Sequence, residues 1–314
     1  MCDLSILLAT RNRATLLDQT LFALAEQDAS SLAWEVIVAD NGSTDSTPEV
    51  LRRWEKKLPL RALYEPVASR NRALNRATPL AQGDYFIFTD DDIIPDPSWL
   101  CEYHQGSRRW PDDAVFGGQV VPHFPDLTPD FLCSDDFCYG AMAYARYVPR
   151  RDEGPVELEP FGPNLMIHRG AFATLRYAEQ ICPSLGSYTA GAETELLMRL
   201  KAAGHRFIYL PRARVQHVIQ PHQLDLRWLL DRAIRFGRAG ARLEPPPNGP
   251  RLLSVPRFLW RRLLEAILRA GMGVLAPRAQ RWESLIRLWH VVGAIRESRA
   301  MARERRVDVP VPAC

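Results

Sequence analysis

The chain has 314 residues, of which 46% are hydrophobic and 25% charged, the balance of a folded globular protein. This composition excludes a disordered chain, a collagen-like repeat and a disulfide-rich scaffold. The formal net charge of +3 is uneven: residues 251–306 hold 13 arginines and four glutamates, a net charge of +9, so the remainder carries −6. Such an asymmetry is typical of a catalytic body followed by a segment that meets anions.

The sequence contains no run of about 18 uncharged apolar residues, so it predicts no membrane-spanning helix. The first residues lack the basic and apolar regions of a signal peptide. The six cysteines form no CxxC pair, which argues against zinc and indicates reduced thiols. The expected location is the cytoplasm, either free or peripheral at the inner face of a membrane.

Strands and helices alternate over the first 120 residues. Short apolar runs predict buried strands at 4–9, 34–39, 60–64 and 84–89. Between them, helical spacing and capping residues predict helices at 14–27, after Ser46, and at 68–77. This alternation indicates a doubly wound, mainly parallel sheet of the α/β class.

The pattern loosens beyond residue 114. Further strands are expected at 114–121, 164–168, 206–210 and 213–219, and helices at 192–202 and 224–240, while 122–160 reads as long loops. A proline-rich linker at 244–250 precedes two amphipathic helices at about 254–272 and 279–304. We therefore predict one large domain at 1–243, with a regular part (1–120) and a less regular part (121–243), and a basic helical tail at 251–306.

Three aspartates, Asp90, Asp91 and Asp92, follow the fourth strand directly. Ligands of open α/β sheets bind at the carboxyl ends of strands. Carboxylates crowded there repel one another unless a cation is near, and oxygen ligands suit Mg²⁺ or Mn²⁺, which can bridge a diphosphate. The alternative is a solvated acidic turn.

Four ordered motifs together resemble the inverting, nucleotide-sugar-dependent glycosyltransferases of family 2, which have the GT-A fold. They are Ser5–Arg13 (SILLATRNR), Val38–Asp45 (VADNGSTD), Ala68–Ala73 (ASRNRA) and Gly83–Asp92 (GDYFIFTDDD). The likeness covers about residues 3–240. It implies a GT-A-like fold with a C-terminal helical extension, in which 1–243 is the catalytic domain, 1–120 its nucleotide-binding half and 121–243 its acceptor half. It also implies a nucleotide-sugar site formed by Thr10, Arg13, Asp40, Arg70, Asp90 and Asp91.

Asp40 and Arg70 also have a physical basis for these roles. Asp40 follows a buried strand and precedes a glycine turn, so its carboxylate can accept a hydrogen bond from uracil or guanine; the alternative is a turn aspartate bonded to its own loop. Arg70 lies at a helix N-terminus, where both the guanidinium and the helix attract phosphate. A surface arginine is the alternative for Arg70.

The resemblance continues in the acceptor half. Gly162–Phe172 resembles the family's acceptor-side strand, which implies an acceptor-side role for Asn164. Gly191–Leu200 (GAETELLMRL) resembles the helix that carries the family's base, which implies Glu193 as the general base. Ala192 departs from the family's usual acid there, and Glu193 replaces its usual aspartate. Some relatives hold a histidine where His217 ends a strand, which adds His217 to Asp90 and Asp92 as a metal ligand.

A general base must remove the proton of the acceptor hydroxyl as its oxygen attacks the sugar. Glu195 lies two residues beyond Glu193, about 200° around the helix, so the two cannot face the same sugar. The alternative for both is a pair of acidic residues favoured by the helix dipole.

The two tail helices each carry an apolar face with arginines beside it. Basic amphipathic helices that contain tryptophan can lie on an anionic membrane surface. The alternative is that these faces pack on the core or on a second chain. No nucleic-acid-binding motif accompanies the arginines, so nucleic acid is not expected as a partner. The faces comprise Val255, Phe258, Leu259, Leu263, Ile267 and Leu268, then Trp282, Leu285, Ile286, Trp289, Val292 and Ile295.

The sequence therefore predicts an inverting, metal-dependent glycosyltransferase. Its donor is a nucleoside-diphosphate sugar, with a UDP-sugar favoured, and its acceptor a glycan or lipid-linked hydroxyl. One alternative is a sugar-1-phosphate nucleotidyltransferase, which would need a glycine-rich loop after the first strand; Ala9–Arg13 has no glycine. The other is a non-catalytic nucleotide-sugar-binding protein, which Ala192 leaves open.

Overall fold

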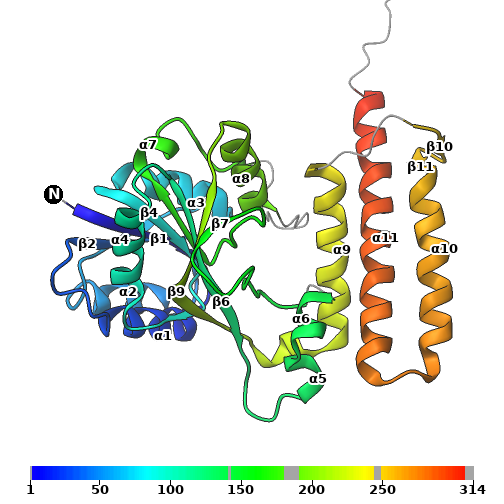
Figure 1. Cartoon of the computed structure of the whole chain (residues 1–314), viewed down its shortest axis with the longest axis horizontal. Coiled ribbons are helices and arrows are strands. Elements are labelled where there is room, and N and C mark those ends of the chain that lie inside the picture. The colour runs from blue at the N-terminus through cyan, green and yellow to red at the C-terminus, as the bar shows by residue number, and fades with distance from the viewer. Residues whose placement is uncertain (1, 141–142, 180–190, 244–248, 308–314) are drawn as a thin grey trace, which may run out of the picture. The chain divides into compact units, whose positions relative to one another are not determined.

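The computed structural model describes residues 2–140, 143–179, 191–243 and 249–307 (Figure 1). Within these ranges the chain forms two compact units. The first holds residues 2–123, 145–179 and 192–218, and the second holds 124–140, 143–144, 191, 219–243 and 249–307.

The first unit is built on a nine-stranded sheet in the order β3-β2-β1-β4-β8-β6-β9-β5, with β7 also paired to β9. Six strands point the same way, while β5, β7 and β8 run antiparallel to their neighbours. The predicted mainly parallel α/β sheet is confirmed. The strands are β1 (Cys2–Thr10), β2 (Trp34–Asp40), β3 (Leu60–Tyr64), β4 (Gly83–Thr89), β5 (Ile93–Pro95), β6 (Val115–His123), β7 (Gly154–Val156), β8 (Asn164–His168) and β9 (Phe207–Val218).

Helices cover both faces of this sheet. Leu4, Ile6 and Leu8 of β1 pack with α1, α2 and α4 in one core, while Leu7 packs with α3, α7 and α8 in the other. The side chains of a strand alternate between faces, so one apolar strand supplies both layers. The helices are α1 (Ala14–Ala25), α2 (Thr47–Trp54), α3 (Arg70–Ala77), α4 (Trp99–Arg109), α7 (Arg169–Phe172) and α8 (Ala192–Ala202), with a 3₁₀ turn η1 (Thr78–Leu80).

Two sequence predictions for the chain beyond residue 114 were wrong in detail, and one short strand was missed. The two strands expected at 206–210 and 213–219 are one strand, β9, whose register against β6 shifts between Gly118 and Gln119. A bulge at this point accommodates Pro211, which has no N–H to donate. The expected loop at 122–160 contains two short helices, α5 (Asp130–Cys133) and α6 (Asp135–Gly140), and β7. Strand β5 was not anticipated.

The second unit is mainly helical. Figure 1 shows α9 (Leu226–Leu243), α11 (Arg278–Val307) and α10 (Arg257–Met272) side by side. Helices α9 and α11 approach closely at two glycines: a Cβ on Gly237 would lie 1.9 Å from the His290 carbonyl oxygen, and one on Gly293 would lie 2.3 Å from that of Ile234. The smaller elements are β10 (Arg251–Leu252), β11 (Val255–Pro256) and the 3₁₀ turns η3 (Pro221–Leu224) and η4 (Gly273–Leu275).

The apolar faces predicted for the tail divide into two groups. Val255, Leu259 and Ile295 form one buried cluster of the second unit, and Trp282 and Ile286 belong to another. These residues follow the packing alternative. Ile267 and Leu268 instead remain exposed on α10.

Among the helices in the described ranges, not one combines the length and apolar character that crossing a bilayer requires. Cys2, Cys101, Cys133 and Cys138 are free thiols. Cys182, Cys314 and most of the predicted linker (244–248) lie outside the described residues.

Candidate active site

The carboxyl ends of three neighbouring strands carry polar residues. Thr10 ends β1 and is paired in register with Asp40, which ends β2. On the other side of β1, Leu7 is paired with Phe88 of β4, so the turn after Thr89 begins level with the end of β1. The three aspartates of that turn lie at the sheet edge where open α/β proteins bind ligands.

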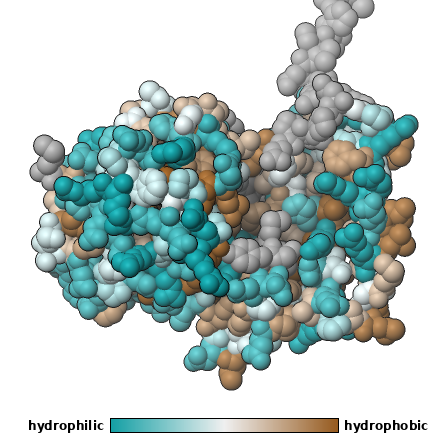
Figure 2. Space-filling model, in the orientation of Figure 1, coloured by the Kyte–Doolittle hydropathy of each residue, from teal (hydrophilic) through white to brown (hydrophobic). Residues whose placement is uncertain are grey.

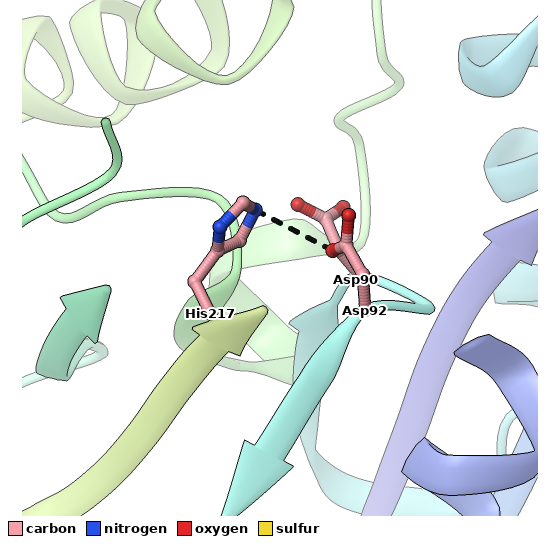
Figure 3. Close-up of side chains that lie close together, drawn as sticks. All are labelled: Asp90, Asp92 and His217. Atoms are coloured by element: carbon pink, nitrogen blue, oxygen red, sulfur yellow. Dashed lines mark ion pairs between the residues drawn. The ribbon is translucent and has the colours of Figure 1, made fainter. Parts of the chain in front are cut away.

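Asp90, Asp92 and His217 form a cluster at this edge. Strand β5 pairs antiparallel with β9 and sets Ile93 opposite His217, which brings the imidazole beside Asp92. Figure 3 shows the three side chains pointing toward one another, and one ligand atom of each lies within 4.8 Å of the others. His217 Nε2 is 3.4 Å from Asp92 Oδ1. That buried oxygen has no hydrogen-bond partner among the described residues, so the cluster offers an open ligand position.

Asp91 instead makes polar contacts with the end of β1 and with the loop that follows this strand. The Thr10 hydroxyl donates to Asp91 Oδ2 at 2.6 Å, and Arg13 donates to Asp91 Oδ1 and to Asp92 Oδ2, both at 2.8 Å. Burial raises the pKa of Asp91 to about 6, with Asp92 and Asp90 adding to the effect and Arg13 and Thr10 opposing it. Burial disfavours the charged form of Arg13 and by itself would lower its pKa. The negative charges of Asp91 and Asp92 have the larger combined effect, so the pKa of Arg13 is raised.

Arg70 connects the aspartate turn to α8. It begins α3, whose N-cap Ser69 accepts a hydrogen bond from the Arg72 amide at 3.3 Å. Its guanidinium donates to Asp90 Oδ1 at 2.8 Å and also to Glu193 Oε1. Burial opposes the ionisation of Asp90, but Arg70 and His217 outweigh it and lower the pKa of Asp90. One cation therefore joins the predicted base to a predicted metal ligand.

The two glutamates of α8 have different surroundings. A Cβ on Gly162 would lie 2.7 Å from Glu193 Cγ, so only glycine leaves room for this side chain beside the loop before β8. Glu195 instead accepts two hydrogen bonds from Arg199, one turn on, each at 2.7 Å. Glu193 therefore faces the aspartate cluster, while Glu195 belongs to a separate ion pair.

The charges of this site do not balance. Four carboxylates (Asp90, Asp91, Asp92 and Glu193) contact two guanidiniums (Arg13 and Arg70), which leaves two negative charges beside a histidine. A divalent cation would offset this excess, and carboxylate oxygens with one imidazole nitrogen form a suitable donor set. The residues present thus fit a divalent metal ion.

Asp40 is buried, and its Oδ1 accepts a hydrogen bond from the Ser43 amide at 2.9 Å. This contact is the one expected for a turn aspartate. The carboxylate nevertheless lies at the end of β2, level with Thr10 on the neighbouring strand. Its contact with a nucleobase stays a prediction.

Asn164 does not join the cluster. It is fully buried at the start of β8, where Trp99 Nε1 and the Tyr103 hydroxyl donate to its Oδ1 at 2.9 and 2.6 Å. Its Nδ2 donates to the carbonyls of Gln119 (2.9 Å) and Ala213 (2.7 Å), which flank the bulge between β6 and β9. These four hydrogen bonds support a structural role for Asn164, in joining strands of the sheet. A direct contact of Asn164 with the acceptor remains a prediction, and the buried position of its side chain does not favour it.

We expect Asn164→Ala to lower the free energy of unfolding by about 3–5 kcal/mol, because it leaves several buried polar groups without partners. Denaturant unfolding measures the effect. Asn75→Ala, which removes contacts with the backbone of Tyr177 at a half-buried position, should cost only about 1 kcal/mol. An Asn164→Ala protein that keeps its stability but loses turnover would restore the predicted acceptor contact.

Two features of the site were not anticipated from the sequence. One is the contact of Arg70 with both Asp90 and Glu193, which joins residues 123 positions apart. The other is the close approach of the Glu193 side chain to Gly162. In the sequence, Gly162 is recognisable only as part of a glycine-proline turn.

The sequence pattern of the family described as "Glycosyl transferase family 2" matches residues 5–175. Validoxylamine A glucosyltransferase of Streptomyces hygroscopicus subsp. jinggangensis is 36% identical over 102 residues, which are 31% of this chain and 24% of that protein. Hyaluronan synthase of Pasteurella multocida is 34% identical over 136 residues, 41% of this chain and 14% of that protein. The matched part of the chain thus spans a quarter or less of the length of these relatives.

Solved structures resemble the chain over most of its length. A mannosyltransferase, PcManGT, from Pyrobaculum calidifontis, in complex with GDP-Man and Mn²⁺, has a TM-score of 0.61 at 18% identity, covering 94% of this chain and 86% of that one. S. aureus TarS 1–349 in complex with UDP-GlcNAc has a TM-score of 0.54 at 15% identity, covering 96% and 92%. These likenesses confirm the predicted GT-A fold. Because the family pattern matches more than half of the residues, the chain belongs to glycosyl transferase family 2.

Proposed function

We propose that the protein transfers a sugar, with inversion, from a nucleoside-diphosphate sugar to an acceptor hydroxyl, in a metal-dependent reaction. The observation that carries this proposal is the double contact of Arg70, which sets Glu193 beside the Asp90–Asp92–His217 cluster. A transferase needs a base for the acceptor and a counter-charge for the leaving diphosphate in one site.

Asp90, Asp92 and His217 are the residues that would hold Mg²⁺ or Mn²⁺. When bound, the metal ion supplies positive charge that stabilises the departing diphosphate. Asp91 does not belong to this set, since it is engaged by Thr10 and Arg13. Its part is to hold Arg13 at the sheet edge, where a guanidinium can contact phosphate oxygens.

Glu193 acts as the general base. Its carboxylate accepts the proton of the acceptor hydroxyl as that oxygen bonds to the anomeric carbon, and the bond from that carbon to the diphosphate breaks. The contact with Arg70 holds the Glu193 carboxylate beside the aspartate cluster. Attack from the side opposite the diphosphate gives inversion.

The donor is proposed to be a UDP-sugar, with Asp40 accepting a hydrogen bond from the uracil N–H. The similar structures are complexes with GDP-Man, UDP or UDP-GlcNAc, which supports a nucleotide-sugar donor in general. The acceptor is proposed to be a cell-envelope glycan or a lipid-linked hydroxyl, and the location the cytoplasm or the inner face of the membrane. In this proposal residues 1–243 catalyse the transfer and 251–306 form an accessory tail.

The test is a panel of UDP- and GDP-sugars with Mn²⁺ or Mg²⁺ and a set of glycan and lipid-linked acceptors, with release of nucleoside diphosphate as the readout. We expect release with at least one donor, abolished by a chelator. Donor binding without release in every combination would indicate a binding protein. Release of pyrophosphate from a nucleoside triphosphate and a sugar-1-phosphate would indicate a nucleotidyltransferase.

Asp40→Asn should weaken UDP binding about 10- to 100-fold, because a hydrogen bond to a charged group contributes about 1.5–3 kcal/mol. Asparagine keeps the shape of the side chain and can still accept from the Ser43 amide, so the melting temperature should change little. Calorimetric titration with UDP measures the effect. Asp113→Asn is the control, since Asp113 is equally buried but pairs with Arg206. Equal affinities of the Asp40→Asn and wild-type proteins would remove Asp40 from the site.

A further inference from the structure

The second unit has an exposed apolar surface at the C-terminal end of α10 and the turn that follows. Six large apolar side chains within twelve consecutive residues are between 49% and 97% exposed: Leu264, Ile267, Leu268, Met272, Val274 and Leu275. We call these six residues the apolar tip. In Figure 2 brown residues gather along the outer edge of the region where Figure 1 draws α10. A surface of this kind marks an interaction site.

Packing within the second unit does not use the apolar tip. Leu264, Leu268 and Met272 follow one another at intervals of four residues, which places them on one face of α10 with Ile267 beside them. Leu259 and Ala266 are buried on the other side of the helix. Helix α10 thus has two apolar faces. The face with Leu259 and Ala266 packs inside the unit, and the face with the apolar tip is exposed to solvent.

Positive charge surrounds the apolar tip. Residues 257–287 contain seven arginines, all exposed, and two glutamates, a net charge of +5. Glu265 and Glu283 are paired with Arg261 and Arg287. Arg269, in the last turn of α10, and Arg281, in the first turn of α11, form no ion pair with the residues that the structure describes. Unpaired guanidiniums beside bare apolar side chains call for a partner that is both apolar and anionic.

A groove between α10 and α11 adds a place for anionic groups. It has a volume of about 440 Å³, and its lining includes Arg262 and Arg269, which form no ion pair with described residues, beside Glu265 and the Glu283–Arg287 ion pair. A guanidinium binds phosphate oxygens in a bidentate manner, so this lining suits the phosphate of a lipid headgroup.

We propose that the apolar tip docks on an anionic membrane surface, with its side chains in the acyl boundary and the surrounding arginines on lipid phosphates. A bilayer that contains acidic lipids offers an apolar layer directly below a negative one, which matches the arrangement of the tip and its arginines. A second copy of this chain fits less well, because it would bring two clusters of like charge together. Membrane docking is independent of the transfer reaction, and it can be measured without an assay of sugar transfer.

The test is flotation of the full-length protein with vesicles of phosphatidylcholine alone or with about 30% phosphatidylglycerol, at low salt and at about 1 M salt, where charges are screened beyond about 3 Å. We expect binding to the anionic vesicles that falls at high salt, and little binding to neutral ones. Leu275→Asp should lower the bound fraction at least about tenfold, because it places a charge in the acyl boundary. Leu127→Asp is the matched control, with 101% exposure against 97% for Leu275.

A second pair of variants tests the charge. Arg269→Gln/Arg281→Gln should weaken binding to anionic vesicles, whereas Arg108→Gln/Arg151→Gln, two exposed arginines of the first unit, should not. Unchanged melting temperatures verify that each variant is folded. Equal binding by wild type and Leu275→Asp would overturn the proposal, as would equal binding to neutral and anionic vesicles. A wild-type dimer that does not bind vesicles and that Leu275→Asp dissociates would identify a second copy as the occupant.

Discussion

Replacing Glu193 with glutamine should lower kcat by about 10²–10⁴-fold, the usual contribution of a general base, while donor affinity stays close to that of the wild type. Glutamine keeps the length of the side chain, fits beside Gly162 and can still accept from Arg70. It cannot take the acceptor proton. Single-turnover and steady-state rates with a saturating donor measure the effect.

Glu195→Gln is the matched control. Both glutamates lie in the first turn of α8, so the helix dipole acts on both. Glu195 is held by Arg199, which also donates to the Arg176 carbonyl at 2.6 Å. Losing this ion pair at a half-buried position should change kcat by less than about tenfold, with a small loss of stability.

The reverse ranking of the two variants would assign the base to Glu195 and contradict the orientation of α8. Equal and small effects of both would remove both glutamates from the role of general base. An Arg70→Lys variant adds a further check. Lysine keeps the positive charge but cannot hold Asp90 and Glu193 with one planar fork, so kcat should fall more than donor affinity.

The sheet edge could be predicted because each residue there ends or directly follows an apolar run. Thr10 and Asp40 end β1 and β2, Asp90 follows β4, and the parallel order of these strands brings their ends together. His217 could be assigned to the metal cluster only through the family resemblance, since short-range patterns do not reveal that β9 pairs with β5. Strand β5 has three residues, too few for a periodic signal.

Contacts that depend on tertiary packing were not accessible from the sequence. The place of Glu193 beside Arg70 depends on how α8 lies on the sheet, and on Gly162 in the loop before β8. Asn164 is assigned to the acceptor side because Gly162–Phe172 resembles the family's acceptor-side strand. Its partners Trp99, Tyr103 and Ala213 come from distant elements that meet at the bulge in β9.

Replacing Asp92 with alanine should abolish metal-dependent turnover and lower the affinity for Mn²⁺ by at least about tenfold. Asp92 Oδ1 is the buried oxygen that has no hydrogen-bond partner among the described residues, and it faces His217 Nε2. Removing it leaves the metal with Asp90 and His217 alone, and the site loses one of its two excess negative charges. Metal binding can be measured directly by calorimetry or by the paramagnetic signal of free Mn²⁺, without any turnover.

Two further variants distinguish the loss of a metal ligand from a loss of folded protein. Asp113→Asn disrupts another buried aspartate that pairs with an arginine, Arg206, so it should cost stability but leave Mn²⁺ binding unchanged. His217→Asp keeps a ligand at the same place but exchanges nitrogen for oxygen. Because imidazole suits Mn²⁺ better than Mg²⁺, this variant should lose Mn²⁺ affinity relative to Mg²⁺. Two results would contradict this prediction: full turnover of the wild type in excess chelator, or unchanged Mn²⁺ affinity of Asp92→Ala. Either would show that the aspartates hold no catalytic metal ion, which leaves Arg13 and Arg70 to stabilise the leaving diphosphate.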